Sequence, residues 1–209
     1  MQENGLPIGY KEGLRFGALG PGWVHICVDM QRMFLDTTPW QAEWMPRVLP
    51  IVARLVEASP ERTIFTRFVP PMEVSEARGT WRRYYERWPM MTRSRLGDEP
   101  VDLVPALARF TPPARVHDKS VYSPWTDGRL LVGLRRLSVD TLVVSGTETE
   151  VCVLATVLGA IDHGFRVIVA TDAVCSSADA THDAMLEIYH SRFGMQVETA
   201  EAREILEAA

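Results

Sequence analysis

The sequence contains few cysteines, no excess of positive charge and no long apolar run. The 209 residues include three cysteines, Cys27, Cys152 and Cys175, and no C-x-x-C pair, which argues against a disulfide framework. Lys and Arg number 22 against 27 Asp and Glu, so the net charge is -5 and the basic field typical of nucleic-acid or membrane binding is missing. No apolar run approaches the roughly 18 residues of a membrane-spanning helix. We therefore expect a cytoplasmic protein with neither a nucleic acid nor a membrane as its partner.

The remaining composition is that of a globular protein with a buried core. Hydrophobic residues make up 46% of the chain and charged residues 23%, and we find no repeat or low-complexity segment. We predict a single domain over residues 1–209. Residues 1–22 form an N-terminal extension without the apolar core of a signal peptide, and residues 68–113 form an irregular insert rich in proline and arginine.

Short apolar runs alternate with longer segments of helical periodicity. Strands are predicted over 24–28, 63–66, 115–117, 141–144, 166–170 and 196–198, and helices over 46–58, 128–137, 151–163, 178–193 and 200–209. This alternation predicts an α/β fold, a three-layer α-β-α sandwich around a mainly parallel, Rossmann-like sheet of about six strands. Continuous rather than alternating apolar character in three of the runs is typical of central parallel strands.

Two signals delimit the helix that follows the fourth predicted strand. Thr147 with Glu150 three residues later matches a capping box at its start. At the other end, His163 followed by Gly164 matches a cation at a helix C-terminus and a left-handed cap.

Ionisable side chains follow three of the predicted strands. Asp29 comes after the first strand, Lys119 after the third, and Cys152 after the turn that follows the fourth. Because ligands of open parallel sheets bind beyond the carboxyl ends of the strands, these three side chains could converge at one edge. A helix N-terminus favours a thiolate, a carboxylate can accept the thiol proton, and an ammonium group can hold both in register. Taken singly, each residue is more simply explained as a loop cap, a surface lysine or an inert buried thiol.

The segments around these residues resemble the isochorismatase-like cysteine hydrolases. The matching stretches are Val28 to Gln31, Lys119 to Trp125 and Ser145 to Val153. They resemble the family signatures D-x-Q, K-x-x-x-S-x-aromatic and G-x-x-[ST]-x-x-C-V, in the same order along the chain. The resemblance covers roughly residues 22–200 and implies a homodimer or homotetramer.

The resemblance also implies a role for each residue of the three motifs. Asp29 would be the general acid and base, Lys119 its partner, and Cys152 the nucleophile. A cis peptide bond is implied between Thr147 and Glu148, and an oxyanion hole from the backbone N–H groups of Glu148 and Cys152. In the implied mechanism the thiolate attacks a carbonyl group, ammonia or an amine leaves, and water cleaves the resulting thioester.

Two departures from relatives narrow the expected chemistry. Nicotinamidases carry Asp and His metal ligands just after the second strand, whereas residues Phe65 to Pro71 contain neither, and the five histidines show no metal-binding spacing. Isochorismatases that cleave a vinyl ether can lack the nucleophilic cysteine, which this chain has. We therefore predict an amidohydrolase without metal or cofactor, acting on a small amide, carbamoyl or ureido substrate. The alternatives are an ether hydrolase and a catalytically silent binding or scaffold protein.

An aromatic stripe lies inside the irregular insert. Trp81, Tyr84, Tyr85 and Trp88 share one face of a predicted helix, and three arginines lie off that face. We expect this helix to cover the mouth of the active site, from its own or a neighbouring subunit; ordinary packing and a subunit contact are the alternatives. The expected substrate pocket consists of Gln31, Phe34, Trp125, Trp81, Tyr85 and Arg83, with one of Arg82, Arg83 and Arg87 binding a substrate carboxylate.

Overall fold

A computed structural model describes residues 13–209 and is built around six parallel strands. These are β1 (Trp23–Val28), β2 (Thr63–Phe68), β3 (Arg115–Lys119), β4 (Thr141–Thr147), β5 (Arg166–Cys175) and β6 (Val197–Ala200). They form one sheet in the order β3-β2-β1-β4-β5-β6, in which every neighbouring pair is parallel. The predicted α/β fold with a six-stranded Rossmann-like sheet is therefore confirmed.

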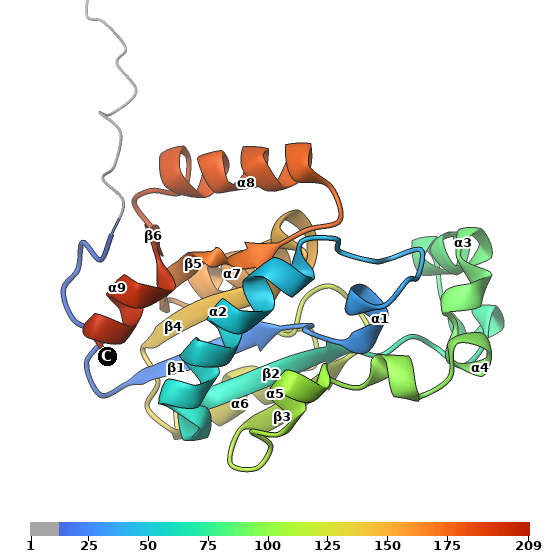
Figure 1. The fold of residues 1–209 in the computed structure, drawn as a ribbon, viewed down its shortest axis with the longest axis horizontal. Coiled ribbons are helices and arrows are strands. Elements are labelled where there is room, and N and C mark those ends of the chain that lie inside the picture. The colour runs from blue at the N-terminus through green and yellow to red at the C-terminus, as the bar shows by residue number, and fades with distance from the viewer. Residues whose placement is uncertain (1–12) are drawn as a thin grey trace, which may run out of the picture.

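Helices cover both faces of this sheet (Figure 1). One layer contains α2 (Met45–Ala58), α5 (Pro105–Ala108) and α9 (Ala202–Glu207), and the other contains α6 (Arg129–Arg136), α7 (Leu154–Asp162) and α8 (Asp179–Ser191). Successive strand residues point to opposite faces. Within β1, Cys27 belongs to the core under α2, whereas Ile26 and Val28 belong to the core under α7. Burial on both faces explains why the central strands are continuously apolar.

The strand order places a topological switch point between β1 and β4. From β1 the chain adds β2 and β3 on one side, and from β4 it adds β5 and β6 on the other. Loops that leave two neighbouring strands in opposite directions open a crevice at their carboxyl ends, where ligands of such sheets bind. The segment that follows β1 begins with Asp29, and the segment that follows β4 leads to Cys152. Both segments leave the sheet at this switch point.

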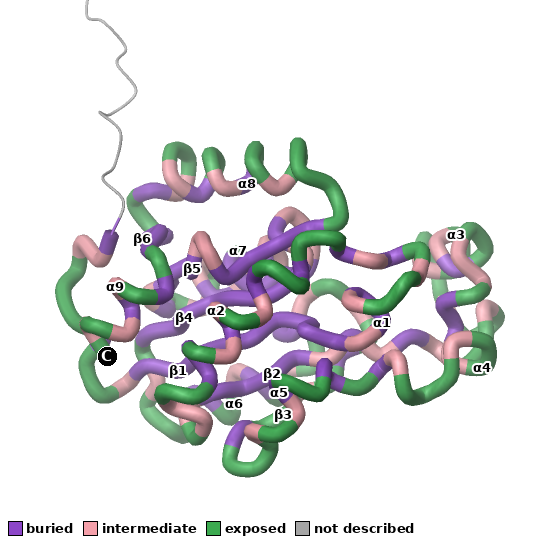
Figure 2. The backbone as a smooth tube through the Cα atoms, in the orientation of Figure 1, coloured by how far each residue is buried: buried purple, intermediate pink, exposed green. Residues whose placement is uncertain are grey.

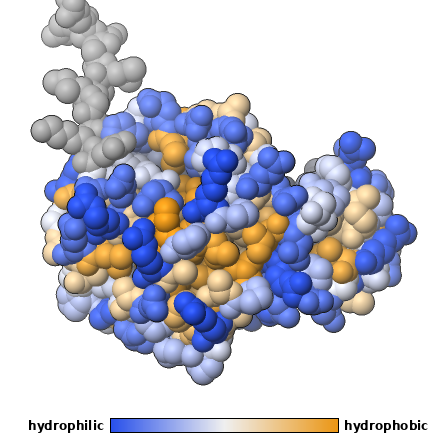
Figure 3. All heavy atoms as spheres, in the orientation of Figure 1, coloured by the Kyte–Doolittle hydropathy of each residue, from blue (hydrophilic) through white to orange (hydrophobic). Residues whose placement is uncertain are grey.

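Between β2 and β3 the chain makes an excursion that projects from the body of the molecule. It carries α3 (Thr80–Arg87) and α4 (Arg93–Leu96) before α5 returns to the sheet layer, and α1 (Arg32–Leu35) lies between the sheet and this lobe (Figure 1). Burial along the lobe is patchy, in contrast to the continuously buried central strands (Figure 2). In the space-filling view the lobe stands apart from the body, with hydrophilic and hydrophobic residues side by side on its surface (Figure 3).

Two local expectations differ from the structure. Thr147 is the last residue of β4, and its hydroxyl donates to the Cys175 carbonyl (3.2 Å) instead of capping a helix, so the predicted capping box is wrong. Residues Thr149–Val153 form a wide π-type turn before α7 begins at Leu154. Strand β5 extends five residues beyond its predicted end at Ala170, because its pairing with β4 resumes after a register irregularity.

The other end of α7 agrees with the sequence. His163 is the C-terminal cap, and Gly164 follows with a φ of 83°. This left-handed conformation is the one that glycine adopts without steric cost.

The predicted N-terminal extension lies partly outside the described residues, which begin at Gly13. The Gly13 N–H donates to the Thr199 carbonyl (2.7 Å) and the Leu19 N–H to the Ala208 carbonyl (3.1 Å). Residues 13–22 therefore lie against the C-terminal end of the chain. Among residues 13–209, no helix combines the length and the apolar character needed to cross a membrane.

Candidate active site

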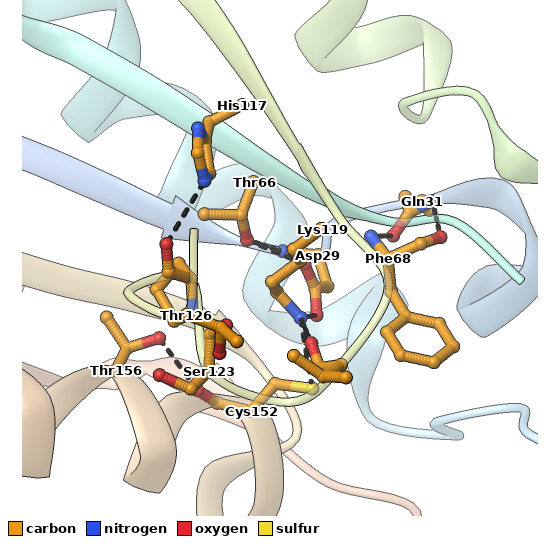
Figure 4. Close-up of polar contacts among 12 residues, drawn as sticks. Asp29, Gln31, Thr66, Phe68, His117, Lys119, Ser123, Thr126, Cys152 and Thr156 are labelled. Atoms are coloured by element: carbon orange, nitrogen blue, oxygen red, sulfur yellow. Dashed lines mark hydrogen bonds and ion pairs between the residues drawn. The ribbon is translucent and has the colours of Figure 1, made fainter. Parts of the chain in front are cut away.

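Asp29, Lys119 and Cys152 meet at the carboxyl edge of the sheet (Figure 4). The Lys119 ammonium lies 2.6 Å from Oδ2 of Asp29 and 3.4 Å from Sγ of Cys152. All three side chains are buried. Three residues that are 90 and 33 positions apart along the chain thus form one continuous cluster, with the ammonium group between the carboxylate and the thiol.

Backbone geometry and one threonine orient the carboxylate of Asp29. Asp29 has a φ of 50°, in the left-handed region that Asp tolerates better than most residues, and it follows the last residue of β1. Its Oδ1 accepts a hydrogen bond from the Thr66 hydroxyl (2.6 Å), while Oδ2 faces Lys119. Both carboxylate oxygens are therefore engaged. Nothing about Thr66 in the sequence marked it as part of the site, because its role depends on β2 lying beside β1.

Lys119 is held as an ammonium ion by its neighbours. Burial by itself would lower its pKa, but attraction to Asp29 and Cys152, together with hydrogen bonds to both, raises the pKa above its usual value. Its third contact is the Val121 carbonyl, 3.2 Å away, and the Phe68 ring lies 5.1 Å from the ammonium nitrogen. The side chain of Lys119 is therefore fixed, charged and directed at the other two members of the cluster.

Cys152 lies in the turn after β4, against the end of β1. Burial, and then the charge of Asp29, raise the pKa of Cys152 well above its usual value, and Lys119 opposes this shift. The turn requires a close approach of two strands at Gly146, which has a φ of 108°. A Cβ atom there would lie 2.1 Å from the Val28 carbonyl oxygen, so only glycine fits. The raised pKa favours the thiol form of Cys152 at neutral pH, with the Asp29 carboxylate nearby.

The turn that carries Cys152 begins with a cis peptide bond between Thr147 and Glu148. The Glu148 carbonyl accepts hydrogen bonds from the N–H groups of Val151 and Val153 (both 3.0 Å). The Glu148 side chain accepts a hydrogen bond from the Ser177 N–H (3.2 Å), and burial raises the pKa of its carboxyl group. The oxyanion hole assigned to the N–H groups of Glu148 and Cys152 stays a prediction.

A cavity of about 230 Å³ opens onto the sulfur of Cys152. It is lined by Phe34, Trp40, Phe68, Tyr84, Tyr122, Glu148, Val151 and Cys152. Five of these eight residues are aromatic. Tyr84 belongs to α3, so the excursion of this same chain contributes a wall of the cavity.

The structure places the predicted pocket residues in different surroundings. Phe34 lines the cavity at Cys152, as expected. Gln31 does not, because its side-chain amide bonds to the backbone of Phe68 and Val101 and ties two loops together. Trp125 does not line the cavity either, because it packs in the core under α6 and α7, the cluster that also contains Cys152, with its indole N–H donating to the Thr156 carbonyl (2.9 Å).

The residues predicted from α3 lie outside the cavity. Trp81 and Tyr85 line a neighbouring open groove of about 630 Å³, which also reaches Lys119. Arg83 is exposed and lines neither space. Arg82 donates to the Ser75 carbonyl, and Arg87 lies over the Trp88 ring, so these arginines are not placed to bind a carboxylate at Cys152. The sequence did not predict three of the lining residues, Trp40, Tyr84 and Tyr122. Tyr122 could have been predicted, since it lies within the motif from Lys119 to Trp125.

Among residues 13–209, no three His, Cys, Asp or Glu side chains come together as metal ligands. Neither the predicted lack of a metal nor the predicted lack of a cofactor is tested by this geometry, and both stay predictions.

A parallel sheet with a carboxylate, an ammonium and a thiol gathered at its switch point defines a doubly wound α/β protein with a cysteine-centred site. The chain belongs to the isochorismatase family: the family model for the isochorismatase domain matches residues 24–201. It is similar in structure to a cysteine hydrolase from Pseudomonas syringae pathovar phaseolicola, with a TM-score of 0.79 and 22% identity over 95% of this chain and 97% of that one. At that level of identity the similarity concerns the fold alone.

Curated relatives match shorter segments. Nicotinamidase 3 of Arabidopsis thaliana is 32% identical over 78 residues, which are 37% of this chain and 39% of that protein. Maleamate amidohydrolase of Pseudomonas putida is 34% identical over 73 residues, 35% of this chain and 34% of that protein. The chain thus spans less than half of the length of these two relatives.

Proposed function

We propose that this protein is a metal-independent cysteine hydrolase that cleaves a C–N bond in a small amide, carbamoyl or ureido substrate. The observation that carries the proposal is the buried Asp29–Lys119–Cys152 cluster opening onto a cavity of substrate size. The names of the two curated relatives, a nicotinamidase and a maleamate amidohydrolase, support amide hydrolysis. The absence of Asp and His from Phe65 to Pro71 supports the lack of a metal ion.

The first half of the reaction forms a covalent intermediate. Asp29 accepts the proton of the Cys152 thiol as the sulfur attacks the substrate carbonyl carbon, and one C–S bond forms. The N–H groups of Glu148 and Cys152 would stabilise the negative charge on the carbonyl oxygen. Asp29 then returns the proton to the nitrogen, the C–N bond breaks, and ammonia or an amine leaves a thioester on Cys152.

The second half restores the enzyme. Asp29 takes a proton from a water molecule whose oxygen attacks the thioester carbon. The C–S bond then breaks, Asp29 passes that proton to the sulfur, and the acid product leaves with Cys152 again a thiol. Lys119 remains protonated throughout, because its raised pKa keeps the ammonium charged beside the two groups that change protonation.

A substrate panel with two readouts tests the proposal. Primary amides, ureido acids and carbamoyl amino acids are incubated with the protein, ammonia release is measured, and intact mass reports an acyl adduct on Cys152. We expect ammonia release with a trappable adduct, unchanged by a chelator. If the chelator removed a stoichiometric metal ion and activity was lost with it, metal independence would be contradicted. Turnover of a vinyl ether without an adduct would replace amide hydrolysis with ether hydrolysis, and no turnover of either would favour a silent binding protein.

The resemblance supports two further proposals about the protein as a whole. We propose a homodimer or homotetramer, which light scattering after size-exclusion chromatography would distinguish from a monomer. The predicted partner in the reaction is a small molecule rather than a macromolecule, in agreement with the size of the cavity.

A further inference from the structure

We infer that the cavity at Cys152 selects by charge: it takes an acyl group that is flat and carries no negative charge, and the Glu148 side chain is the group that rejects anions. This inference rests on the proposed function, since it names the class of substrate for the same site. It also differs from the expectation that an arginine of α3 binds a substrate carboxylate.

Aromatic rings supply most of the cavity wall. Trp40 lies at the centre of this wall, with its ring centroid 6.3 Å from that of Phe34, 5.9 Å from Phe68 and 5.6 Å from Tyr84. Tyr122 completes the wall from the loop after Lys119. Rings in such an arrangement present large apolar surfaces, which favour flat groups that can stack on them. Their faces are electron-rich, so they also tolerate a cation and disfavour an anion.

The described lining of the cavity includes a carboxyl group and no cationic side chain. Glu148 is the only lining residue with a carboxyl group, and no Lys or Arg is among the described residues that line the cavity. Next to it, the charges of Asp29 and Lys119 compensate each other through a contact of 2.6 Å. In its ionised form the carboxyl group of Glu148 is thus not balanced by a cation in the cavity wall, and a carboxylate on the substrate would repel it.

The environment of Glu148 already disfavours negative charge. Burial is the largest cause of its raised pKa, and the nearby carboxylates of Glu150 and Asp29 raise it further. A hydrogen bond from the Ser177 N–H offsets part of this effect. An anion bound beside Glu148 would raise this pKa further, at the cost of repulsion or of proton uptake by Glu148, whereas an uncharged or cationic group would not.

The polar groups that the aromatic walls offer are uncharged. The indole N–H of Trp40 is buried and has no acceptor among the described residues. Burial, with neighbouring negative charges, raises the pKa values of Tyr84 and Tyr122, so both phenols stay neutral. Orientation of a substrate in this cavity therefore depends on neutral donors, without a guanidinium group to form a paired contact with a carboxylate.

A pair of probes of equal shape and different charge tests the inference. Isothermal titration of the Cys152→Ala protein would measure the dissociation constants of 4-acetylbenzamide and 4-carbamoylbenzoate, independently of turnover. We expect the neutral amide to bind at least about tenfold more tightly than the anion. Equal or tighter binding of the anion would overturn the inference, as would failure of both probes to bind at millimolar concentration.

A second variant assigns the effect to one carboxyl group. Glu148→Gln, in the Cys152→Ala background, keeps an oxygen that can accept from Ser177 and removes the charge. We expect it to improve binding of the anion and reduce the ratio between the two probes to below about threefold. The matched control is Glu150→Gln, because Glu150 bonds to Ser176 and Thr181 and does not line the cavity. An unchanged ratio in Glu148→Gln, or an equal change in Glu150→Gln, would contradict the role of Glu148.

Probe binding tests the charge selection and turnover tests amide hydrolysis, so the two claims can fail independently of each other. If the neutral probe binds selectively but the wild-type protein releases no ammonia and forms no adduct, amide hydrolysis is wrong and the charge selection stands. If the wild-type protein hydrolyses 4-carbamoylbenzoate as well as 4-acetylbenzamide, the charge selection is wrong and amide hydrolysis stands.

Discussion

Two regions meet at Cys152, the ends of the strands and the α3 excursion, and they are built on different principles. At the strand ends, Asp29, Lys119 and Cys152 are almost fully buried and contact one another directly. In the excursion, Trp81 and Tyr84 are only half-buried and interact through ring contacts, here at 5.6 Å between centroids. A buried charged cluster tolerates one arrangement, because an unpaired charge there is costly, whereas stacked rings tolerate several. The strand ends therefore hold the groups of the proposed mechanism in one geometry, whereas the ring contacts of the excursion can vary.

The largest effect on activity is expected from removing the sulfur of Cys152. Cys152→Ala should reduce kcat by at least about ten-thousand-fold, since it eliminates the nucleophile, while the far-ultraviolet spectrum and the unfolding transition stay close to wild type. Cys175→Ala is the matched control, because Cys175 is also a buried free thiol but has no contact with Lys119. Retention of near-normal turnover by Cys152→Ala would rule out the covalent mechanism.

Removing the ammonium group should affect both activity and stability. Lys119→Met leaves the Asp29 carboxylate buried without its partner, and we expect a loss of about 3–5 kcal/mol in the free energy of unfolding together with loss of turnover. Urea unfolding measures the first quantity. The double variant Asp29→Asn, Lys119→Met should recover part of the stability and none of the activity. A cost below about 1 kcal/mol for the single change would show that the pair is effectively solvated.

The thiol of Cys152 should react slowly with alkylating agents at neutral pH. A raised pKa means that the thiol form dominates below that pKa, so the rate of iodoacetamide labelling should increase about tenfold per pH unit from about pH 7 to 9. Mass spectrometry of the peptide that contains Cys152 distinguishes it from the other two cysteines. Fast, pH-independent labelling at neutral pH would instead indicate a resting thiolate ion, and Asp29 would not be needed as the base for the first step.

The smallest effect is expected in the aromatic wall. Tyr84→Ala removes a ring from the cavity and should raise KM about two- to tenfold for a flat substrate, with kcat changed less. Trp88→Ala is the control, since Trp88 packs at the end of α3 and does not line the cavity. An equal rise in KM for both variants would show that α3 acts through overall packing rather than through Tyr84.

The sequence predicted the strand-end region well, since each part of it is local. Apolar runs identify β1 and β4, and the residue that follows a parallel strand necessarily lies at the carboxyl edge. The cavity wall was predicted less well, because it depends on how distant segments pack. Trp125 belongs to a site motif, yet its ring packs into the core under α7 instead of lining the cavity. Trp40 lies between β1 and α2 with no local signal, and reaches Tyr84 only through the tertiary fold.

The same dependence on distant contacts explains the errors near Cys152. Thr147 and Glu150 have the spacing of a capping box, but the Thr147 hydroxyl bonds to the Cys175 carbonyl on the extended part of β5. That extension follows the register irregularity beyond Val144, which periodicity within one strand cannot reveal.

The contact between Trp125 and Gly159 links the segment that follows Lys119 to the helix that follows Cys152. A Cβ atom at Gly159 would lie 2.1 Å from the Trp125 ring, so the indole occupies the space that a side chain on α7 would need. The loop that follows Lys119 thus packs against the helix that follows Cys152, and the indole N–H of Trp125 donates to the Thr156 carbonyl on that helix. Because β3 ends at Lys119 and α7 begins shortly after Cys152, this contact joins the segments that follow the ammonium group and the thiol, whose nitrogen and sulfur atoms lie 3.4 Å apart. The lack of a side chain at Gly159 is therefore a steric requirement for this packing, at a residue that does not line the cavity.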